Sequence, residues 1–589
     1  MRRSFALALA VSIAGLSSFG AVVFPWVELI GFDCEAPDCG VGKYLSRMPR
    51  KPQAISLMLD RDTMFRIYDP VLNPEFDLPE DSCSYNGRRY NSERMRQSWR
   101  STHLRKLVAE LKSRGVEVYA AFFHHNEKEM VEEPVAELAV KLARFLADFG
   151  FTGLHGADGY SPPIHCLESL ERLQLSGSED RNRPQAARRE AVRFAAAWKE
   201  IVGRLKEKGL KCYINTCWTL DPYEALFRYG VDYRLLAKTG IDGFVVESSA
   251  SAGLLYRGQV KGRASKQDRS IAMLLRLKAC CPETPMVLLH AVHDGNEQWS
   301  AIRHAPCAMR CEALSMGAVF YGRHRRALEG YLPCLADGLT AAEWKEVFDT
   351  YDLALTPAKE PFGFYYVWSD RAFDAEFDDC AVSLDCSSST VLQELLHYGA
   401  SVTAAISVKD ALADPSLPLL IVNPKYFPKD ELDALRRRPA PVQVAGLGSG
   451  PPDYEPFELV APEKRVFPRE SFDSLLPENM IPADTLYAAA GKVTPRTLWT
   501  RTPDIRLCAY WMLNGRLAVL TRNEGDAYRD VTIDLGWEVT DVLVHTACPS
   551  SPIKTTIKFR VAPHDTAVIS LKDLGSNMPG APVPPADAR

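Results

Sequence analysis

The 589-residue sequence predicts an α/β protein whose largest domain is a (β/α)8 TIM-type barrel. Three observations carry this expectation. Short, nearly continuous apolar runs alternate with amphipathic helical segments from residue 54 to about 355. The alternation continues on a smaller scale to about residue 450, and from about 506 the signals are strands alone. Apolar runs of this kind are typical of parallel strands buried on both faces.

Seven strands and seven helices make up the first series. The strands are predicted at 54–60, 116–123, 151–156, 211–215, 243–246, 285–289 and 317–321. The helices are predicted at 104–114, 135–149, 184–208, 223–238, 271–280, 305–316 and 341–355. A strand count close to eight, with no glycine-rich phosphate loop after the first strand, favours a closed barrel over an open sheet. The eighth strand is expected either in 22–29 or within 61–100.

The rest of the chain predicts two smaller domains. Strands at 364–368, 402–406, 419–422 and 442–445, with helices at 390–398 and 428–437, indicate a doubly wound α/β domain. Six strands between 507 and 571, separated by turns such as Asn514-Gly515, indicate an antiparallel β domain. The predicted units are an N-terminal segment 21–53, the barrel 54–358, the α/β domain 359–450, a linker 451–500, the β domain 501–575 and a disordered tail 576–589.

The first twenty residues have the three parts of a secretory signal peptide. Arg2 and Arg3 precede an apolar run over 5–16, and small residues follow it. We therefore expect cleavage near Gly20 and export to the periplasm or the extracellular space, with no membrane contact afterwards. Because apolar residues resume at Val22, an uncleaved anchor is the alternative.

The composition of the chain bears on whether it binds nucleic acid or zinc and on whether it forms disulfides. Apolar residues make up 46% and charged residues 25%, and the net charge is −5 with dispersed lysines and arginines, so no basic stripe points to nucleic acid. An exported chain with 15 cysteines can form disulfides, and Cys34 with Cys39 is the expected pair. No Cys-x-x-Cys pair with zinc spacing occurs.

Barrels of this type carry their active residues at the C-terminal ends of the strands and in the loops that follow. Carboxylates, histidines and aromatic residues gather at these positions. Such residues suit sugar chemistry, because two carboxyl groups can cleave a glycosidic bond while aromatic and polar side chains hold the sugar. The expected substrate-binding residues are His124, His125, His155, Tyr160, Asn215, Trp218, His290, His293, Asp294 and Arg323.

Asp158 and Glu247 are the predicted catalytic pair, and Asp294 is the reserve. We expect a retaining mechanism with Asp158 as nucleophile and Glu247 as acid/base, although the roles can be reversed and the carboxyl separation decides between retention and inversion. Structural alternatives exist. Asp158 can be a turn residue before Gly159, and Glu247 can belong to a structural ion pair.

The three-domain layout resembles the family 42 β-galactosidases of clan A. The segment from Leu395-Leu-His-Tyr-Gly399 to Leu420-Ile-Val-Asn-Pro424 is similar to the family's middle domain. This resemblance implies a flavodoxin-like fold for that domain and assembly as a trimer. It also implies an acid/base on strand 4, at Ala157-Asp158 where the family has Asn-Glu, and a nucleophile on strand 7, near Asp294 or Glu297.

A second resemblance concerns residues 150–158, which look like the strand 4 segment of barrel glycosidases whose nucleophile is Asp. Those enzymes place the acid Glu on strand 5, whereas Glu247 follows two strands later. The expected function is a glycoside hydrolase acting on a glycan or oligosaccharide without a cofactor or metal. The alternatives are a non-catalytic carbohydrate-binding barrel and a metal-dependent hydrolase that combines His290 and His293 with other histidines.

Overall fold

A computed structural model gives the fold. It describes residues 21–60, 101–123, 135–156, 183–216, 221–248, 266–293, 300–383, 387–447, 457–459, 483–494, 498–500, 502, 504–535, 539–545, 550–553 and 556–573. The predicted signal peptide and tail therefore lie outside the described residues.

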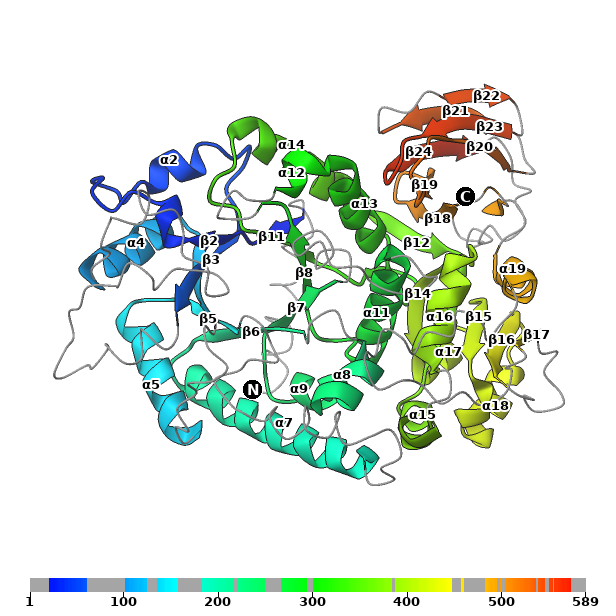
Figure 1. Cartoon of the computed structure of the whole chain (residues 1–589), viewed down its shortest axis with the longest axis horizontal. Coiled ribbons are helices and arrows are strands. Elements are labelled where there is room, and N and C mark those ends of the chain that lie inside the picture. Colours follow the sequence, from blue (N-terminus) through cyan, green and yellow to red (C-terminus); the bar gives the residue numbers. More distant parts are fainter. Residues whose placement is uncertain are drawn as a thin grey trace, which may run out of the picture.

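The first domain is a closed parallel barrel (Figure 1). Its N-terminal segment pairs with both edges of the sheet: β1 (Val22–Val23) pairs with β11 (Gly330–Cys334), and β2 (Trp26–Glu28) pairs with β3 (Ala54–Asp60). Only Phe24 and Pro25 separate β1 from β2, so the two act as one strand that closes an eight-stranded barrel. The others in order are β4 (Glu117–Phe123), β5 (Gly153–Gly156), β6 (Lys211–Asn215), β7 (Gly243–Glu247) and β8 (Met286–Ala291).

Closure settles the position of the eighth strand. The alternative at 22–29 is confirmed, but the expectation that 317–321 is a barrel strand is wrong. Within that range β9 (Phe320–Tyr321) joins a different sheet, and the last barrel strand is β11. Pro333 lies inside β11, and a proline cannot donate to a strand ladder, so the sequence pattern argued against a central strand there.

Helices cover the outside of the barrel (Figure 1). Leu104, Trp198 and Leu274 on these helices belong to one large buried core with the outward-facing strand residues, whereas Phe24, Trp26 and Tyr119 belong to a separate cluster inside the barrel. The barrel's helices are α2 (Val41–Leu45), α4 (Ser101–Ser113), α5 (Val135–Asp148), α7 (Arg183–Glu207), α8 (Pro222–Tyr229), α9 (Tyr233–Ala237), α11 (Lys266–Cys280), α12 (Ala301–His304), α13 (Pro306–Gly317) and α14 (Ala341–Ala354).

The second domain has the flavodoxin-like strand order, as predicted. Its parallel strands lie in the order β14 (Val402–Ser407), β13 (Phe364–Trp368), β15 (Leu419–Val422), β16 (Val442–Leu447), β17 (Phe457–Leu459), which is 2-1-3-4-5. The hairpin of β9 and β10 (Arg325–Arg326) extends this sheet beyond β14. The helices are α15 (Asp370–Ser383), α16 (Ser388–His397), α17 (Val408–Ala413), α18 (Lys429–Arg436) and α19 (Ala483–Lys492). Both β17 and α19 come from 451–500, the segment expected to be a linker.

The third domain is antiparallel, as predicted. A five-stranded sheet contains β12 (Ala358–Phe362), β18 (Ile505–Met512), β19 (Leu517–Asn523), β24 (Thr566–Asp573) and β21 (Val539–Val544). A three-stranded sheet contains β20 (Arg529–Asp534), β23 (Thr556–Val561) and β22 (Ser550–Ile553). Apolar residues of both sheets form a core of their own, and the domain lies beside the end of α13 (Figure 1).

Two expectations about export can be compared with the described residues. The Cys34–Cys39 bridge is wrong, because Cys39 is a buried thiol and burial raises its pKa. Among the residues that the structure describes, no helix is both long and apolar enough to cross a bilayer.

A buried ionic cluster joins the three domains. Asp268 on α11 lies 2.5 Å from Arg522 on β19, 3.9 Å from Arg506 on β18 and 3.4 Å from Nδ1 of His397 on α16. Burial raises the pKa of the Asp268 carboxyl, but Arg522, His397 and Arg506 together outweigh it and the pKa is lowered. The paired charge therefore stays ionised in the interior.

We predict that Arg522→Met lowers the free energy of unfolding by about 3 to 5 kcal/mol, because it leaves a buried carboxylate without its nearest cation. Arg371→Met is the matched control, since Arg371 pairs with Asp430 on the surface and such pairs contribute about 1 kcal/mol or less. Urea unfolding followed by circular dichroism measures both. Equal effects of the two substitutions would contradict the assigned role of Asp268.

Candidate active site

Alternation along the barrel strands decides which side chains face the axis. Ala54 and Met58 on β3 and Val245 on β7 belong to the inner cluster, Tyr213 on β6 packs against it, and every second residue from each of them shares that face. His155 on β5 is paired in register with Tyr213 and lies on the same face. On this count the inner face also carries four polar residues that the structure links to one another. They are Ser56 on β3, His155 on β5, Asn215 on β6 and Glu247 on β7.

These four side chains form a continuous chain of hydrogen bonds across the barrel. Ser56 Oγ lies 2.7 Å from Nδ1 of His155, and Nε2 of His155 lies 2.7 Å from Oδ1 of Asn215. Nδ2 of Asn215 donates to Oε1 of Glu247, also over 2.7 Å. Ser56 and His155 are fully buried, and Asn215 and Glu247 are 2% and 7% exposed.

The direction of each bond follows from the chemistry of the groups. An amide nitrogen only donates, so Asn215 Nδ2 requires an unprotonated Oε1 on Glu247, and Asn215 Oδ1 accepts from His155. His155 therefore carries its proton on Nε2, and Nδ1 accepts from the Ser56 hydroxyl. Burial lowers the pKa of His155 to about 4, against the smaller opposing effect of the Asn215 bond. The ring is neutral at physiological pH, which matches this arrangement.

The backbone on either side of Glu247 is also held. Its N–H donates to Thr216 Oγ1 over 3.0 Å, which ties the end of β7 to the residue after β6. The next residue, Ser248, faces outward and its hydroxyl donates to Glu312 on α13. The strand end is thus fixed both from the barrel interior and from the helix layer.

Aromatic rings pack against the polar chain inside the barrel. The His155 ring centroid lies 5.2 Å from that of Trp26 and 6.1 Å from that of Phe24. Phe24 in turn contacts Tyr119 and Tyr213, at 4.8 and 5.8 Å. A buried polar chain surrounded by apolar groups is favourable only when its members satisfy one another, which strengthens the case for a single fixed geometry.

Glu28 adds another buried carboxylate at this end of the barrel. It is the last residue of β2, it shares the inner face with Trp26 by alternation, and it is fully buried. Sequence reasoning missed it because 22–29 was only one of two places considered for the eighth strand. Ser56 was missed because it lies inside an apolar run, where a polar residue on the inner face is the signal that could have found it.

The structure corrects the prediction for His290. Its neighbour Leu289 faces inward, so by alternation the His290 side chain faces the helices. Its Nε2 donates to the Met309 carbonyl over 2.9 Å, its Nδ1 accepts from the Tyr351 hydroxyl over 2.8 Å, and burial lowers its pKa to about 4. Both ring nitrogens are bonded within the helix layer, so His290 is not placed to contact a substrate at the mouth.

Arg323 is also not part of the mouth. It lies between β9 and β10, whose sheet belongs to the second domain, and its guanidinium lies 2.6 Å from Glu360 and 3.0 Å from Asp414. Its expected role followed from the wrong assignment of 317–321 to the barrel. His293, by contrast, lies two residues after the end of β8, is buried, and its backbone N–H donates to the Cys334 carbonyl at the end of β11.

The remaining predicted residues lie outside the described residues, so their roles stay predictions. They are His124, His125, Asp158, Tyr160, Trp218 and Asp294. The chain places Asp158 two residues after the end of β5, which is the strand that carries His155. Within the described ranges no three histidine, cysteine or acidic side chains are grouped as a metal ion would require.

Comparisons with known proteins support the fold. No family model and no curated protein matches the sequence. The solved β-galactosidase from the psychrophilic Marinomonas ef1 aligns with a TM-score of 0.51 and 10% identity, over 94% of this chain and 100% of that chain. A GH5_18 protein from Streptomyces cattleya in complex with GlcNAc aligns at 0.41 with 13% identity, over 72% and 98% of the two chains. Only the first score is high enough to support an argument, and it shows a shared fold.

Two buried histidines with lowered pKa values predict how stability depends on pH. His155 and His290 have pKa values of about 4 in the fold, against 6.5 for an unperturbed histidine. Below pH 6.5 the unfolded chain binds protons that the folded chain does not, so stability present above pH 6.5 is lost as the pH falls to about 4. Each histidine contributes up to about 3 kcal/mol to this loss.

Urea unfolding of His290→Gln between pH 7.5 and 4.5 measures this effect. We expect the variant to lose less stability over this range than the unsubstituted protein, because one source of the pH dependence is gone. His304→Gln, which changes an exposed histidine, is the control and keeps the original slope. Parallel curves for all three proteins would contradict the buried neutral state of His290.

Proposed function

We propose that this protein is a glycoside hydrolase acting on a glycan or oligosaccharide, with Glu247 as one of its catalytic carboxylates. One observation carries the proposal. A carboxylate at the C-terminal end of a barrel strand is held by a buried chain of neutral polar groups, at the end where barrels of this fold bind their substrates.

Glu247 suits the role of general acid and base. Asn215 Nδ2 donates to Oε1 and so orients the carboxyl group that takes up and returns the proton. Because neither Asn215 nor neutral His155 brings a charge, they orient the carboxyl group without stabilising one protonation state through an ion pair. Orientation of this kind is what proton transfer to a leaving oxygen requires.

The second carboxylate is Asp158 in our preferred mechanism. It acts as nucleophile in a retaining reaction, forming a glycosyl ester that water then hydrolyses with Glu247 as base. Glu28 is the alternative second carboxylate, because it is buried on the inner face of the barrel at the end of β2. A separation of about 5 Å between the two carboxyl groups supports retention, and about 6.5 to 9.5 Å supports inversion.

The alignment with the Marinomonas β-galactosidase, which spans all three domains, makes a β-galactoside the first substrate to test. We also retain two sequence-based proposals. Residues 1–20 direct export to the periplasm or beyond, and the chain forms a homo-oligomer, a trimer if the family 42 resemblance extends to assembly. N-terminal sequencing of the exported protein tests whether residues 1–20 are removed. Gel filtration of the same protein tests the oligomeric state.

We predict that Glu247→Gln lowers kcat/KM on aryl glycosides by about 10²- to 10⁴-fold, the usual contribution of a general acid or base. Asp158→Asn and Glu28→Gln identify the partner, since the one that forms the pair shows a comparable loss. Glu360→Gln changes a buried glutamate outside the barrel mouth and serves as the matched control, with activity within about twofold of the original.

Two outcomes would contradict the proposal. Turnover that survives Glu247→Gln in folded protein removes Glu247 from the catalytic pair. Saturable glycan binding by the unsubstituted protein without turnover on a panel of α- and β-linked aryl glycosides identifies a non-catalytic carbohydrate-binding barrel instead.

A further inference from the structure

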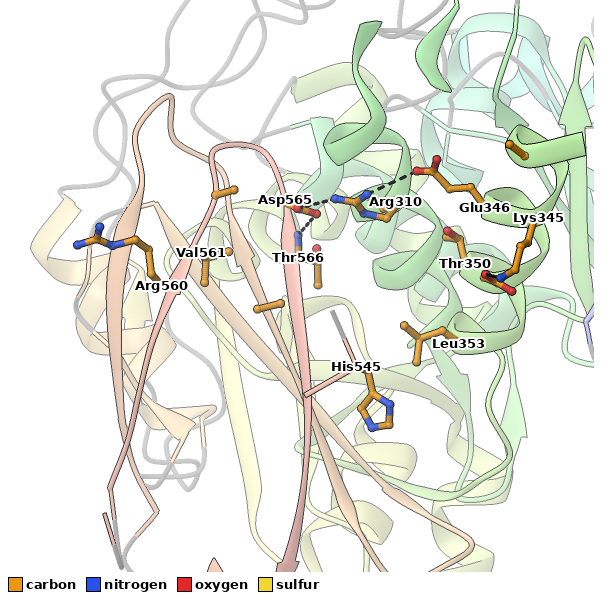
Figure 2. Close-up of a pocket in the computed structure, with 14 residues that line it drawn as sticks. Arg310, Lys345, Glu346, Thr350, Leu353, His545, Arg560, Val561, Asp565 and Thr566 are labelled. Atoms are coloured by element: carbon orange, nitrogen blue, oxygen red, sulfur yellow. Dashed lines mark hydrogen bonds and ion pairs between the residues drawn. The ribbon is translucent and has the colours of Figure 1, made fainter. Parts of the chain in front are cut away.

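A cleft of about 670 Å³ lies between the barrel and the C-terminal β domain (Figure 2). Its volume falls within the range of about 300 to 1,000 Å³ that ligand sites occupy. One wall comes from α14 with Arg310 of α13, and the other from β23, β24 and the turn between them. The candidate residues of the barrel mouth do not line it.

The barrel wall is one continuous face of a helix. Lys345 and Glu346 lie three and four positions after Ala342, Asp349 lies four after Lys345, and Leu353 lies four after Asp349, so these residues form a stripe along α14. From 342 to 353 this stripe is about 16 Å long, at 1.5 Å per residue. The cleft is therefore an elongated groove. Helix α14 begins shortly after the C-terminal end of β11. The end of the groove at Ala342 therefore lies on the side of the barrel where Glu247 is found.

An ion-pair bridge holds the two walls together. Arg310 lies 2.8 Å from Asp565 of the β domain and 3.5 Å from Glu346 of α14 (Figure 2). Desolvation opposes the charge of the guanidinium, but the hydrogen bond to Asp565 and the negative charges around it together outweigh this effect and raise the pKa of Arg310. Because the bridge joins both walls, the width of the groove is fixed before any ligand enters.

The lining has no net charge but many polar groups. Three basic residues (Arg310, Lys345, Arg560) are matched by three acidic ones (Glu346, Asp349, Asp565), and Thr350 and Thr566 add hydroxyls. Burial, together with the Arg516 charge, lowers the pKa of His545, so this residue adds no charge at neutral pH. Leu353, Val561 and Ala567 supply apolar surface between the polar groups.

We propose that this groove binds a neutral oligosaccharide, as a glycan site separate from the barrel mouth. Each sugar hydroxyl both donates and accepts, so alternating cations and carboxylates can bond it from either side. A charged polymer gains no net attraction from a balanced lining. The choice of a sugar rests on the proposed function, whereas the groove and its charge balance do not. A chain bound here lies along α14 toward the mouth, where another part of the same chain can be cleaved.

Calorimetric titration of the full-length Glu247→Gln protein tests the proposal, because we expect this substitution to slow cleavage by at least about 10²-fold. The probes are maltohexaose, cellohexaose, chitohexaose, mannohexaose and β-1,4-galactohexaose, with hexagalacturonate as the acidic counterpart. Lys345→Ala/Asp349→Ala removes an exposed pair whose members bond each other on α14. Lys429→Ala/Asp433→Ala removes an exposed pair of the same spacing on α18 and is the matched control.

We expect at least one neutral hexasaccharide to bind. The double substitution on α14 should reduce its affinity about tenfold or more, and the double substitution on α18 should leave it unchanged. Ala342→Trp fills the groove from an exposed position and should abolish the same binding event. In protein that retains Glu247, the double substitution on α14 should leave hydrolysis of a short aryl glycoside unchanged, because that substrate occupies only the barrel mouth.

The proposal is overturned if no neutral hexasaccharide binds, if neither α14 substitution weakens binding, or if only hexagalacturonate binds through this groove. Failure of the proposed function has a different signature. Aryl glycosides then remain intact in the unsubstituted protein, while binding of a neutral hexasaccharide still depends on Lys345 and Asp349.

Discussion

Closure of the barrel by the segment from Val22 to Glu28 determines the positions of the polar groups inside the barrel and at its mouth. This segment pairs with β11 on one side and β3 on the other, so the eight strands must each turn alternate side chains toward a common axis. The same closure brings Trp26 against His155 and places Glu28 at the mouth. Without it the strands would form an open sheet, and the inner polar residues would not be enclosed.

The interior of such a barrel is usually filled by branched apolar side chains. This barrel contains, beside such apolar residues, a serine, a histidine, an asparagine and a glutamate that bond one another in sequence. Each bond contributes only about 1 kcal/mol net, whereas an unsatisfied group costs about 1 to 3 kcal/mol, so the chain adds little to stability. A conformational or catalytic role explains it better, because the chain holds Glu247 in one orientation at the mouth.

The sequence predicted the strands of the barrel where the chain has long apolar runs, and it predicted Asn215 and Glu247 as mouth residues because they end such runs. It did not predict β11, whose Pro333 interrupts the pattern, and Arg323 was misplaced as a result. His290 was misplaced because a strand end alone does not reveal which face a side chain occupies. Alternation counted from Leu289 in β8 separates His290 from the inner face, once the inner face is known.

Hydrogen-bond partners were beyond reach of the sequence for a different reason. Ser56 and Asn215 are 159 positions apart in the chain, and only the register across β3, β4, β5 and β6 brings them to either side of His155. The groove along α14 likewise depends on how the β domain packs against the barrel, which no local pattern encodes. The stripe of polar residues on α14 was visible in the sequence only as one side of an exposed helix.

The protonation state of His155 tests the central claim most directly, because the hydrogen-bond chain allows only one tautomer. Nitrogen-15 chemical shifts of the histidine rings, assigned by comparison with His155→Gln, report the proton position at pH 6. Our account predicts a neutral ring with the proton on Nε2 and an acceptor at Nδ1. A proton on Nδ1, or an imidazolium at that pH, would contradict the neutral chain in which Ser56 donates to His155 and His155 donates to Asn215.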